Sequence, residues 1–245
     1  MTPRPRLCLN RLPSALPSAV EAFNAQGFET IPMSFVAVEA LPVDLDPGIV
    51  ELDRYDAVVL TSPEAAHRFV AAVERRWPQW PLGLTLWCVG EATAAQVPPE
   101  APPVRVAGTP GSASLMAQMA ADGTFHRCLV ATGAGSGRQF EALTNTVGCA
   151  LDFLDLYRMV SKPPELSDAA VTAPYWVHGS AHLLEVAQRW ALAHAPWWSQ
   201  RVHFVTSDRA EMLLPPGSRY YRILTPAPDA VQNALRGEPC VKDEA

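Results

Sequence analysis

The feature that most constrains the fold of this chain is an internal repeat in circular order. Four segments resemble four others: residues 55–72 resemble 173–188, 84–95 resemble 200–213, 103–120 resemble 220–235, and 126–154 resemble 5–35. Self-similarity over units of this length indicates repeated structure. Because the fourth counterpart lies at the N-terminus, we expect the first residues of the chain to complete its C-terminal half.

Strand-like and helix-like patterns alternate along the whole chain. The apolar run at residues 55–61 (YDAVVLT) is typical of a buried strand, and Ser62 and Pro63 after it are typical of a helix start. Such alternation predicts an α/β fold with parallel sheets covered by helices on both faces. We therefore expect two similar flavodoxin-like domains with parallel sheets, joined by a two-strand hinge.

The repeat also predicts where the domains begin and end. One domain is expected to be continuous over residues 50–155, and the other to combine residues 1–35 with 165–245. The interdomain linkers would be residues 36–49 and 156–164. A chain that crosses twice between two domains forms a hinge, and we expect a cleft beside it.

Composition argues against several classes of function. The formal net charge is −6 and 18% of the residues are charged, whereas proteins that bind nucleic acid or anionic membranes are usually basic. No apolar run reaches the roughly 18–20 residues of a membrane span, and we expect no signal peptide. The five cysteines form no CxxC pair, which favours reduced thiols and a cytoplasmic location.

The expected strand ends carry mostly serine, threonine and glycine. In open α/β sheets, ligands bind outside the carboxyl ends of the strands. Hydroxyl groups and helix N-termini there can bind carboxylates without a net positive charge. The pattern therefore suits an extended anionic ligand.

The order of these motifs resembles the uroporphyrinogen-III synthase family over nearly the whole chain. NRLP at residues 10–13 is similar to the family's opening Thr-Arg-Pro, and LTSP at 60–63 is similar to its Thr-Ser strand end. VGEATA at 89–94 matches the family's Val-Gly-x-x-Thr-Ala in full. LVATGAGSGR at 129–138 resembles its Gly-Arg turn, and Tyr157-Arg158 its strand ending in Tyr-Arg.

This resemblance implies a reaction. Such enzymes cyclise the linear tetrapyrrole hydroxymethylbilane to uroporphyrinogen III, with loss of water and inversion of ring D through a spiro intermediate. The chain would then be a monomeric cytoplasmic lyase of heme biosynthesis that needs no metal and no organic cofactor. Its substrate would come from hydroxymethylbilane synthase by a transient hand-over. The protein would assist departure of the hydroxyl and fold a flexible octa-anion.

The resemblance assigns catalysis to Tyr157. A phenol has an ordinary pKa near 10, so at neutral pH it can donate a proton to a leaving hydroxyl. The alternative is that Tyr157 is simply one more apolar strand residue. The candidate substrate-binding residues lie at expected strand ends or turns: Arg11, Thr61, Ser62, Gly90, Thr93, Arg138, Ser180 and Ser207.

Several of these candidates have ordinary structural explanations. Ser62 is the predicted N-cap of a helix, and Thr93 falls in a first helical turn. Lone arginines such as Arg11 and Arg138 are more often solvated at the surface. The second half also departs from the family, because TSDR at residues 206–209 replaces an expected Gly-x-x-Thr and brings an acidic Asp208.

Other functions are also compatible with parts of the sequence. The loop at residues 133–138 (GAGSGR) resembles a dinucleotide-binding turn but has GxGxG spacing in place of GxGxxG. A hinged binding protein for an anionic metabolite, or an inactive relative of the synthases, would need the same cleft. His178 and His182 lack a third metal ligand, and the six histidines are predicted to be surface or loop residues.

Overall fold

The computed structural model describes residues 4–109, 111–123 and 125–242. The chain divides into two compact units: unit 1 is Met1–Val38 with Val160–Ala245, and unit 2 is Glu39–Met159. The chain therefore passes between the units twice, after Val38 and after Met159.

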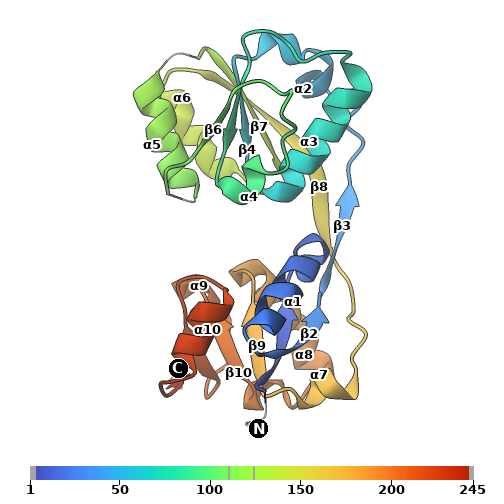
Figure 1. Ribbon diagram of the computed structural model, residues 1–245, viewed down its shortest axis with the longest axis vertical. Coiled ribbons are helices and arrows are strands. Elements are labelled where there is room, and N and C mark those ends of the chain that lie inside the picture. The colour runs from blue at the N-terminus through green and yellow to red at the C-terminus, as the bar shows by residue number, and fades with distance from the viewer. Residues whose placement is uncertain (1–3, 110, 124, 243–245) are drawn as a thin grey trace. The chain divides into compact units, whose positions relative to one another are not determined.

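Unit 1 is built on a six-stranded sheet (Figure 1). Its strands in spatial order are β12 (Cys240–Val241), β11 (Arg219–Arg222), β10 (Val202–Val205), β9 (Tyr175–His178), β1 (Arg6–Asn10) and β2 (Glu29–Met33). All neighbours pair in parallel except β11 and β12. Its helices are α1 (Leu16–Ala25), α7 (Asp168–Thr172), α8 (Ala181–His194), α9 (Asp208–Leu213) and α10 (Pro228–Ala234), with 3₁₀ turns at Pro13–Ala15 and Trp198–Gln200.

Unit 2 is built on the second six-stranded sheet. Its order is β3 (Val36–Ala40), β8 (Ala150–Ser161), β7 (Arg127–Gly133), β4 (Ala57–Leu60), β5 (Thr85–Cys88) and β6 (Val104–Val106), and the pairings from β8 to β6 are parallel. Its helices are α2 (Pro47–Val50), α3 (Pro63–Arg76), α4 (Glu91–Ala94), α5 (Ser112–Asp122) and α6 (Ala142–Thr146), with 3₁₀ turns at Leu52–Arg54 and Arg138–Glu141. The predicted α/β class with parallel sheets is confirmed.

The circular repeat of the sequence is visible in the strand order. The strands β2-β1-β9-β10-β11 of one sheet occupy the same relative positions as β8-β7-β4-β5-β6 of the other. Each pair of equivalent strands comes from a pair of similar sequence segments. Counted along the chain from β1, the first sheet has the order 2-1-3-4-5 that flavodoxin-like folds share.

Both faces of the unit 1 sheet are buried, because strand side chains alternate between faces. Leu7 and Leu9 of β1 pack in one cluster with Phe23 of α1 and Val231 of α10. Cys8, between them, points to the opposite face and joins the cluster formed with α7, α8 and α9. The helices therefore cover the sheet on two sides, which is why the strands read as continuous apolar runs.

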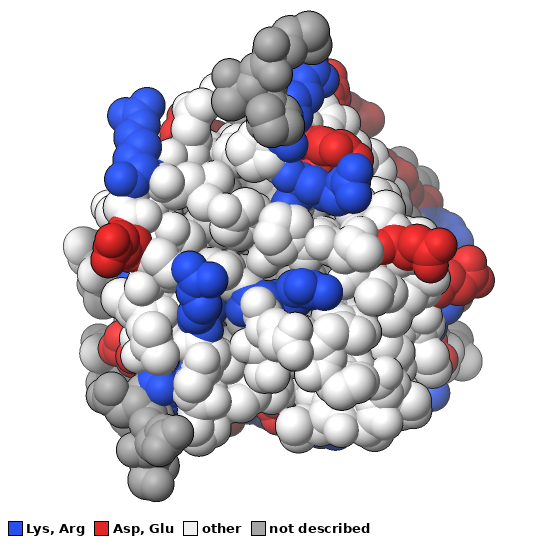
Figure 2. Space-filling model, turned by 90° about the horizontal axis from the view of Figure 1, so that it is seen from below, with Lys and Arg blue, Asp and Glu red and all other residues white. Residues whose placement is uncertain are grey.

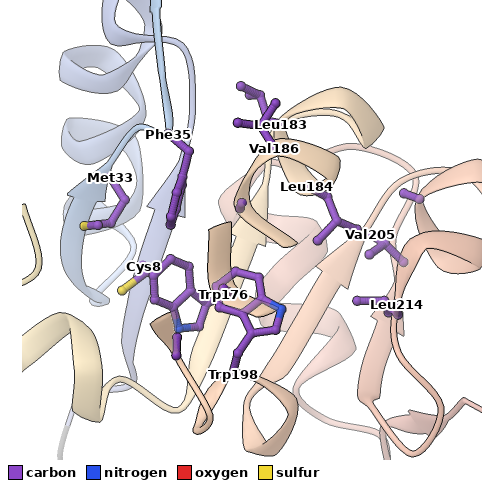
Figure 3. Close-up of a cluster of buried hydrophobic side chains, with 14 of the residues drawn as sticks. Cys8, Met33, Phe35, Trp176, Leu183, Leu184, Val186, Trp198, Val205 and Leu214 are labelled. Atoms are coloured by element: carbon purple, nitrogen blue, oxygen red, sulfur yellow. The ribbon is translucent and has the colours of Figure 1, made fainter. Parts of the chain in front are cut away.

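The cluster on the second face is rich in aromatic side chains. Trp176 of β9 lies next to Trp198, with ring centroids 4.9 Å apart, and Phe35 lies 6.1 Å from Trp176 (Figure 3). All three side chains are almost completely buried. Aromatic rings of this size bury more apolar area than other residues, so they supply a large share of the packing energy of unit 1.

Helix α3 is fixed by its end residues. Ser62 has an extended backbone, and its Oγ accepts the Ala65 N–H at 3.1 Å, as predicted for an N-cap. Pro63 is the first helical residue. The helix ends before Pro78, because a proline disfavours helical dihedrals at the residue that precedes it, here Trp77. These signals place the start of α3 directly after β4, at the carboxyl edge of the sheet.

The sequence patterns misplaced two elements. The pattern of residues 29–38 (ETIPMSFVAV) predicts an extended segment without a break, but these residues form β2 in one sheet and the start of β3 in the other. The break lies at Ser34, whose Oγ donates to Val36 O at 2.9 Å. The pattern of residues 138–147, followed by Gly148, predicts a single helix, but the structure has a 3₁₀ turn followed by the short helix α6.

Charged side chains are sparse and mixed in sign on the face shown in Figure 2. Most of this face is formed by uncharged residues, with basic and acidic side chains interspersed. The backbone of a nucleic acid is usually bound by a continuous basic surface. The described residues on this face form no such surface.

Candidate functional site

The carboxyl ends of three strands of unit 2 meet at one edge of the sheet. Leu60, at the end of β4, pairs with Cys88 of β5 and Ala131 of β7. The backbone continues this alignment past the strands, because Thr61 N donates to Ala131 O and Val89 N donates to Leu60 O, both at 3.3 Å. The residues that follow these strands therefore lie along a common edge.

Tyr157 and Ser62 are in contact at this edge. The Tyr157 hydroxyl lies 3.2 Å from Ser62 Oγ, although the two residues are 95 positions apart in the chain. Tyr157 belongs to β8 and pairs with Gly133 at a shift in register next to Thr132. A shift in register of this kind changes the direction in which a strand side chain points. Here the Tyr157 side chain points toward Ser62 at the start of α3.

Gly133 makes room for the phenol ring. A Cβ atom on Gly133 would lie 2.7 Å from Cε2 and Cζ of Tyr157, closer than carbon atoms can approach. The neighbouring hydroxyls are also ordered, because Thr61 Oγ1 donates to Ala131 O at 3.1 Å and lies 3.0 Å from Thr132 Oγ1. The edge is therefore a packed polar cluster around one tyrosine.

This close approach predicts the effect of Gly133→Ala. The backbone of Gly133 is not in the left-handed region, so the added methyl group acts only by displacing the Tyr157 ring. We expect overpacking to cost about 1–3 kcal/mol of unfolding free energy. Displacement of the hydroxyl should lower kcat by about 10-fold. Urea unfolding and steady-state kinetics measure the two effects.

Gly108→Ala is the matched control for that substitution. Gly108 lies in the same unit, is exposed, and has open space where its Cβ would be. Its unfolding free energy and kcat should stay close to those of the unmodified protein. Equal kcat in the Gly133 and Gly108 variants would contradict the assigned packing of Tyr157.

Arg68 and Glu64 of α3 complete the surroundings of Tyr157. The Arg68 Cζ lies 5.9 Å from the centre of the Tyr157 ring, and Arg68 Nε donates to Glu64 Oε1 at 2.7 Å. Neither residue belongs to the motifs singled out in the sequence. The signal that could have found them is helical spacing, since Glu64 and Arg68 are four residues apart on the helix that Ser62 caps.

The other candidates of unit 2 lie in different surroundings. Thr93 is buried in the first turn of α4, as the structural explanation predicted, and its N–H donates to Gly90 O at 3.0 Å. Arg138 is exposed, with its guanidinium 4.4 Å from the Phe153 ring centre and 3.7 Å from Glu141. The structure therefore does not bring Arg138 to the Tyr157 cluster.

The candidates of unit 1 lie at the carboxyl edge of their own sheet. Ser180 Oγ accepts the Leu183 N–H at 3.3 Å, and Ser207 Oγ accepts the Ala210 N–H at 3.2 Å, so both are helix N-caps. Arg11, just past β1, is only 7% exposed, which corrects the expectation of a solvated side chain.

Arg11 packs closely against two loops and is hydrogen-bonded to one of them. Its Nη2 donates to Pro226 O, and a Cβ atom on Gly179 would lie 2.9 Å from its Nη1. Burial lowers the pKa of Arg11 to about 10, which still leaves the guanidinium charged at neutral pH. Arg11 is therefore a buried positive charge for which the described residues offer no carboxylate partner.

A chain of buried polar side chains lies behind Arg11. Asn10 Nδ2 lies 3.1 Å from His178 Nδ1, and His178 Nε2 lies 3.1 Å from His203 Nδ1. His203 Nε2 lies 3.3 Å from Trp198 O. Because an amide nitrogen only donates, both imidazoles must be neutral with the proton on Nε2. The prediction that the histidines are surface or loop residues is wrong for these two.

These two histidines should make folding stability depend on pH. Burial lowers the pKa of His203 to about 4, and burial together with His203 and Arg11 lowers that of His178. The unfolded chain therefore binds more protons than the folded one between pH 4 and about 6.5, so stability falls as pH falls through that window. Each histidine should contribute up to about 1.4 kcal/mol per pH unit there.

Urea unfolding between pH 5 and 6 measures this slope. His203→Gln should reduce the slope by up to about 1.4 kcal/mol per pH unit, the contribution of one proton. A His203→Gln variant with the slope of the unmodified protein would contradict a neutral, buried His203.

The described residues contain no group of three or more His, Cys, Asp or Glu side chains that could hold a metal ion. His178 is engaged with Asn10 and His203, so it does not form the pair with His182 that was considered as a metal site. In the part of the chain that the structure describes, no helix is long and apolar enough to cross a membrane.

Comparison with known proteins places the chain in a family. A family model described as uroporphyrinogen-III synthase HemD matches residues 18–177, well over half of the chain. No curated protein matches the sequence.

Solved structures show the same fold at low sequence identity. A mutant uroporphyrinogen III synthase from the extremely thermophilic bacterium Thermus thermophilus is 13% identical, with 95% of this chain and 98% of that chain covered and a TM-score of 0.53. Uroporphyrinogen-III synthetase from Helicobacter pylori is 12% identical, with 95% and 99% covered and a TM-score of 0.58. The family match and the shared two-sheet fold lead to one conclusion: this chain belongs to the uroporphyrinogen-III synthases, the cyclising lyases of heme biosynthesis.

Proposed function

We propose that the chain closes hydroxymethylbilane to uroporphyrinogen III with Tyr157 as the group that assists departure of the substrate's hydroxyl. The observation that carries this proposal is the 3.2 Å contact between Tyr157 and Ser62 at the carboxyl edge of the unit 2 sheet. Ligands of open α/β sheets bind at such edges. A phenol there can act as a general acid or hydrogen-bond donor.

The hydrogen bonds of Ser62 favour this role. Ser62 Oγ accepts the Ala65 N–H, so its own hydroxyl proton is free to be donated to the Tyr157 oxygen. Tyr157 then keeps its phenolic proton for the leaving hydroxyl. Tyr157 is only 6% exposed, and limited access of water strengthens such a hydrogen bond.

The remaining candidates are proposed to hold the carboxylates of the substrate. Arg11 supports this assignment best, because it is a buried guanidinium that the described carboxylates leave unpaired. Ser62 and Ser180 each cap a helix of 14 residues, whose N-terminal N–H groups favour anions. Thr61, Gly90, Thr93, Arg138 and Ser207 are weaker members of the proposed set.

Asp208, the acidic residue in place of the expected Gly-x-x-Thr pattern in unit 1, forms an ion pair with a neighbouring arginine. Asp208 Oδ1 lies 2.8 Å from Arg222 Nη1, so its charge is compensated by an ion pair. Arg209 is likewise paired, with Nη2 3.3 Å from Glu185 Oε2. The pairing reduces the repulsion that Asp208 would exert on a substrate carboxylate.

We also propose that the protein acts as a monomer in the cytoplasm. All five cysteines are free and four of them are buried, which fits a reducing compartment. Hydroxymethylbilane closes to the type I isomer when unassisted, so direct hand-over from hydroxymethylbilane synthase would protect the substrate.

Genetic complementation tests the proposed function in a cell. The gene is expressed in a bacterial strain that lacks its own uroporphyrinogen-III synthase and needs added heme. The proposal predicts growth without heme, and slower growth with Tyr157→Phe. Failure to restore growth, with the folded protein present at normal abundance, would favour a binding protein or an inactive relative instead.

A further inference from the structure

We propose that Arg68 binds a carboxylate of the substrate next to the Tyr157 hydroxyl and so positions the reacting end of the tetrapyrrole. This inference rests on the proposed function of the Tyr157 edge. Arg68 lies in the second turn of α3, and its Cζ is 5.9 Å from the centre of the Tyr157 ring. The same ring carries the hydroxyl that contacts Ser62 at 3.2 Å.

The guanidinium of Arg68 is held in place along one edge only. Its Nε and Nη2 both lie 2.7 Å from the same oxygen, Oε1 of Glu64. A guanidinium has five N–H donors, and the described residues provide no other acceptor for those of Arg68. The unused edge is therefore free for a second carboxylate.

The burial of the pair suits a site prepared for a ligand. The Glu64 side chain is 11% exposed and that of Arg68 is 25% exposed, so the acidic partner lies deeper than the basic one. Glu64 thus fixes the orientation of the guanidinium, while the Arg68 side chain remains partly exposed to solvent. Contact with the Tyr157 ring further restricts the guanidinium.

The chemistry of this arrangement selects a carboxylate. The planar fork of arginine matches the two oxygens of a carboxylate, and such charge-assisted bonds are stronger than neutral ones. Hydroxymethylbilane carries a carboxylate on every side chain of its four rings. One of these groups bound by Arg68 would place an adjacent pyrrole ring close to the Tyr157 hydroxyl.

Other arginines of the same helix lack this environment. Arg75 is exposed and pairs with Asp44 through Nη2 at 2.7 Å, two turns further along α3. An exposed ion pair of that kind contributes little to stability or binding. Arg75 therefore provides a matched control on the same helix.

The test measures KM and kcat for Arg68→Gln, Arg68→Lys and Arg75→Gln, together with the melting temperature of each. A carboxylate contact made equally in the ground state and the transition state acts on KM. Arg68→Gln should therefore raise KM about 10-fold while kcat stays within about threefold. Arg68→Lys should restore part of the loss, and Arg75→Gln should leave both constants unchanged.

The outcomes separate this inference from the function on which it rests. If the unmodified protein forms no type III product, the proposed function fails. If it does, and Arg68→Gln keeps the KM of the unmodified protein, Arg68 does not bind substrate, whatever happens to the melting temperature. A raised KM with an unchanged melting temperature excludes a merely structural role and supports the contact.

Discussion

Replacement of Tyr157 by Phe is expected to lower kcat by about 100-fold, the lower end of the range for a general acid. The substitution removes only the hydroxyl that lies 3.2 Å from Ser62 Oγ, and the ring still fits against Gly133. The loss should therefore appear in kcat and leave KM within a few-fold. Steady-state formation of uroporphyrinogen III measures both constants.

Tyr55→Phe is the matched control for this prediction. Tyr55 is a second buried tyrosine of unit 2, but its hydroxyl donates to Asp152 at 3.1 Å and lies outside the Tyr157 cluster. Its removal should leave kcat unchanged in the folded protein. If Tyr157→Phe retained more than half of the activity, the general-acid role of Tyr157 would be wrong.

Replacement of Trp176 by Ala is expected to cost about 3–5 kcal/mol of unfolding free energy, because it empties the centre of a packed core. Trp176 is fully buried, and the ring centroids of Phe35, Trp197 and Trp198 lie within 6.1 Å of its own. Figure 3 shows Phe35 and Trp198 beside it. Many domains have only about 5–15 kcal/mol in total, so the variant should be close to unfolding at about 37 °C.

Urea unfolding followed by circular dichroism measures the effect of Trp176→Ala. Leu192→Ala, at a position that is 76% exposed in the same unit, should change the unfolding free energy by less than about 0.5 kcal/mol. A loss below about 1 kcal/mol for Trp176→Ala would contradict the packing of this cluster. Trp176→Phe should be milder, because it also removes a buried indole N–H that has no acceptor among the described residues.

The fold was largely predictable because the two halves of the structure come from similar sequence segments. Five strands of each sheet, all except β12 and β3, have an equivalent in the other sheet, and the order of similar segments matches the spatial order of these strands. The repeat predicts that a linker begins at residue 36, close to the break at Ser34 that separates two strands of different sheets. The apolar pattern of residues 29–38 by itself does not signal this break.

The edge of the unit 2 site was predictable, but its contacts were not. Thr61 and Ser62 were expected at a carboxyl strand end because the pattern of an apolar run followed by a helix cap places them there. Contact of Tyr157 with Ser62 depends on the register of β8 against β7, which sequence periodicity does not fix. Arg68 could not be singled out from the sequence, because arginines are common on helix surfaces. Its contacts with Glu64 and Tyr157 are seen only in the structure.

The buried histidines illustrate the same limit. His178 and His203 lie at the end of one strand and in the middle of the next, where alternation could place them in the core or at the surface. Their burial follows from Asn10 and the Trp198 carbonyl, which complete their hydrogen bonds. Asn10 is 168 residues from His178 in the chain, and a contact at that separation leaves no signal in a single sequence.

The isomer of the product tests the central claim most directly. Hydroxymethylbilane is generated in place by its own synthase, with and without this protein, and the oxidised porphyrins are separated by chromatography. The account predicts that type III dominates only when the protein is present, and that type I takes its place in the Tyr157→Phe reaction as the enzyme becomes limiting. Type I as the main product at every concentration of the unmodified protein would contradict it.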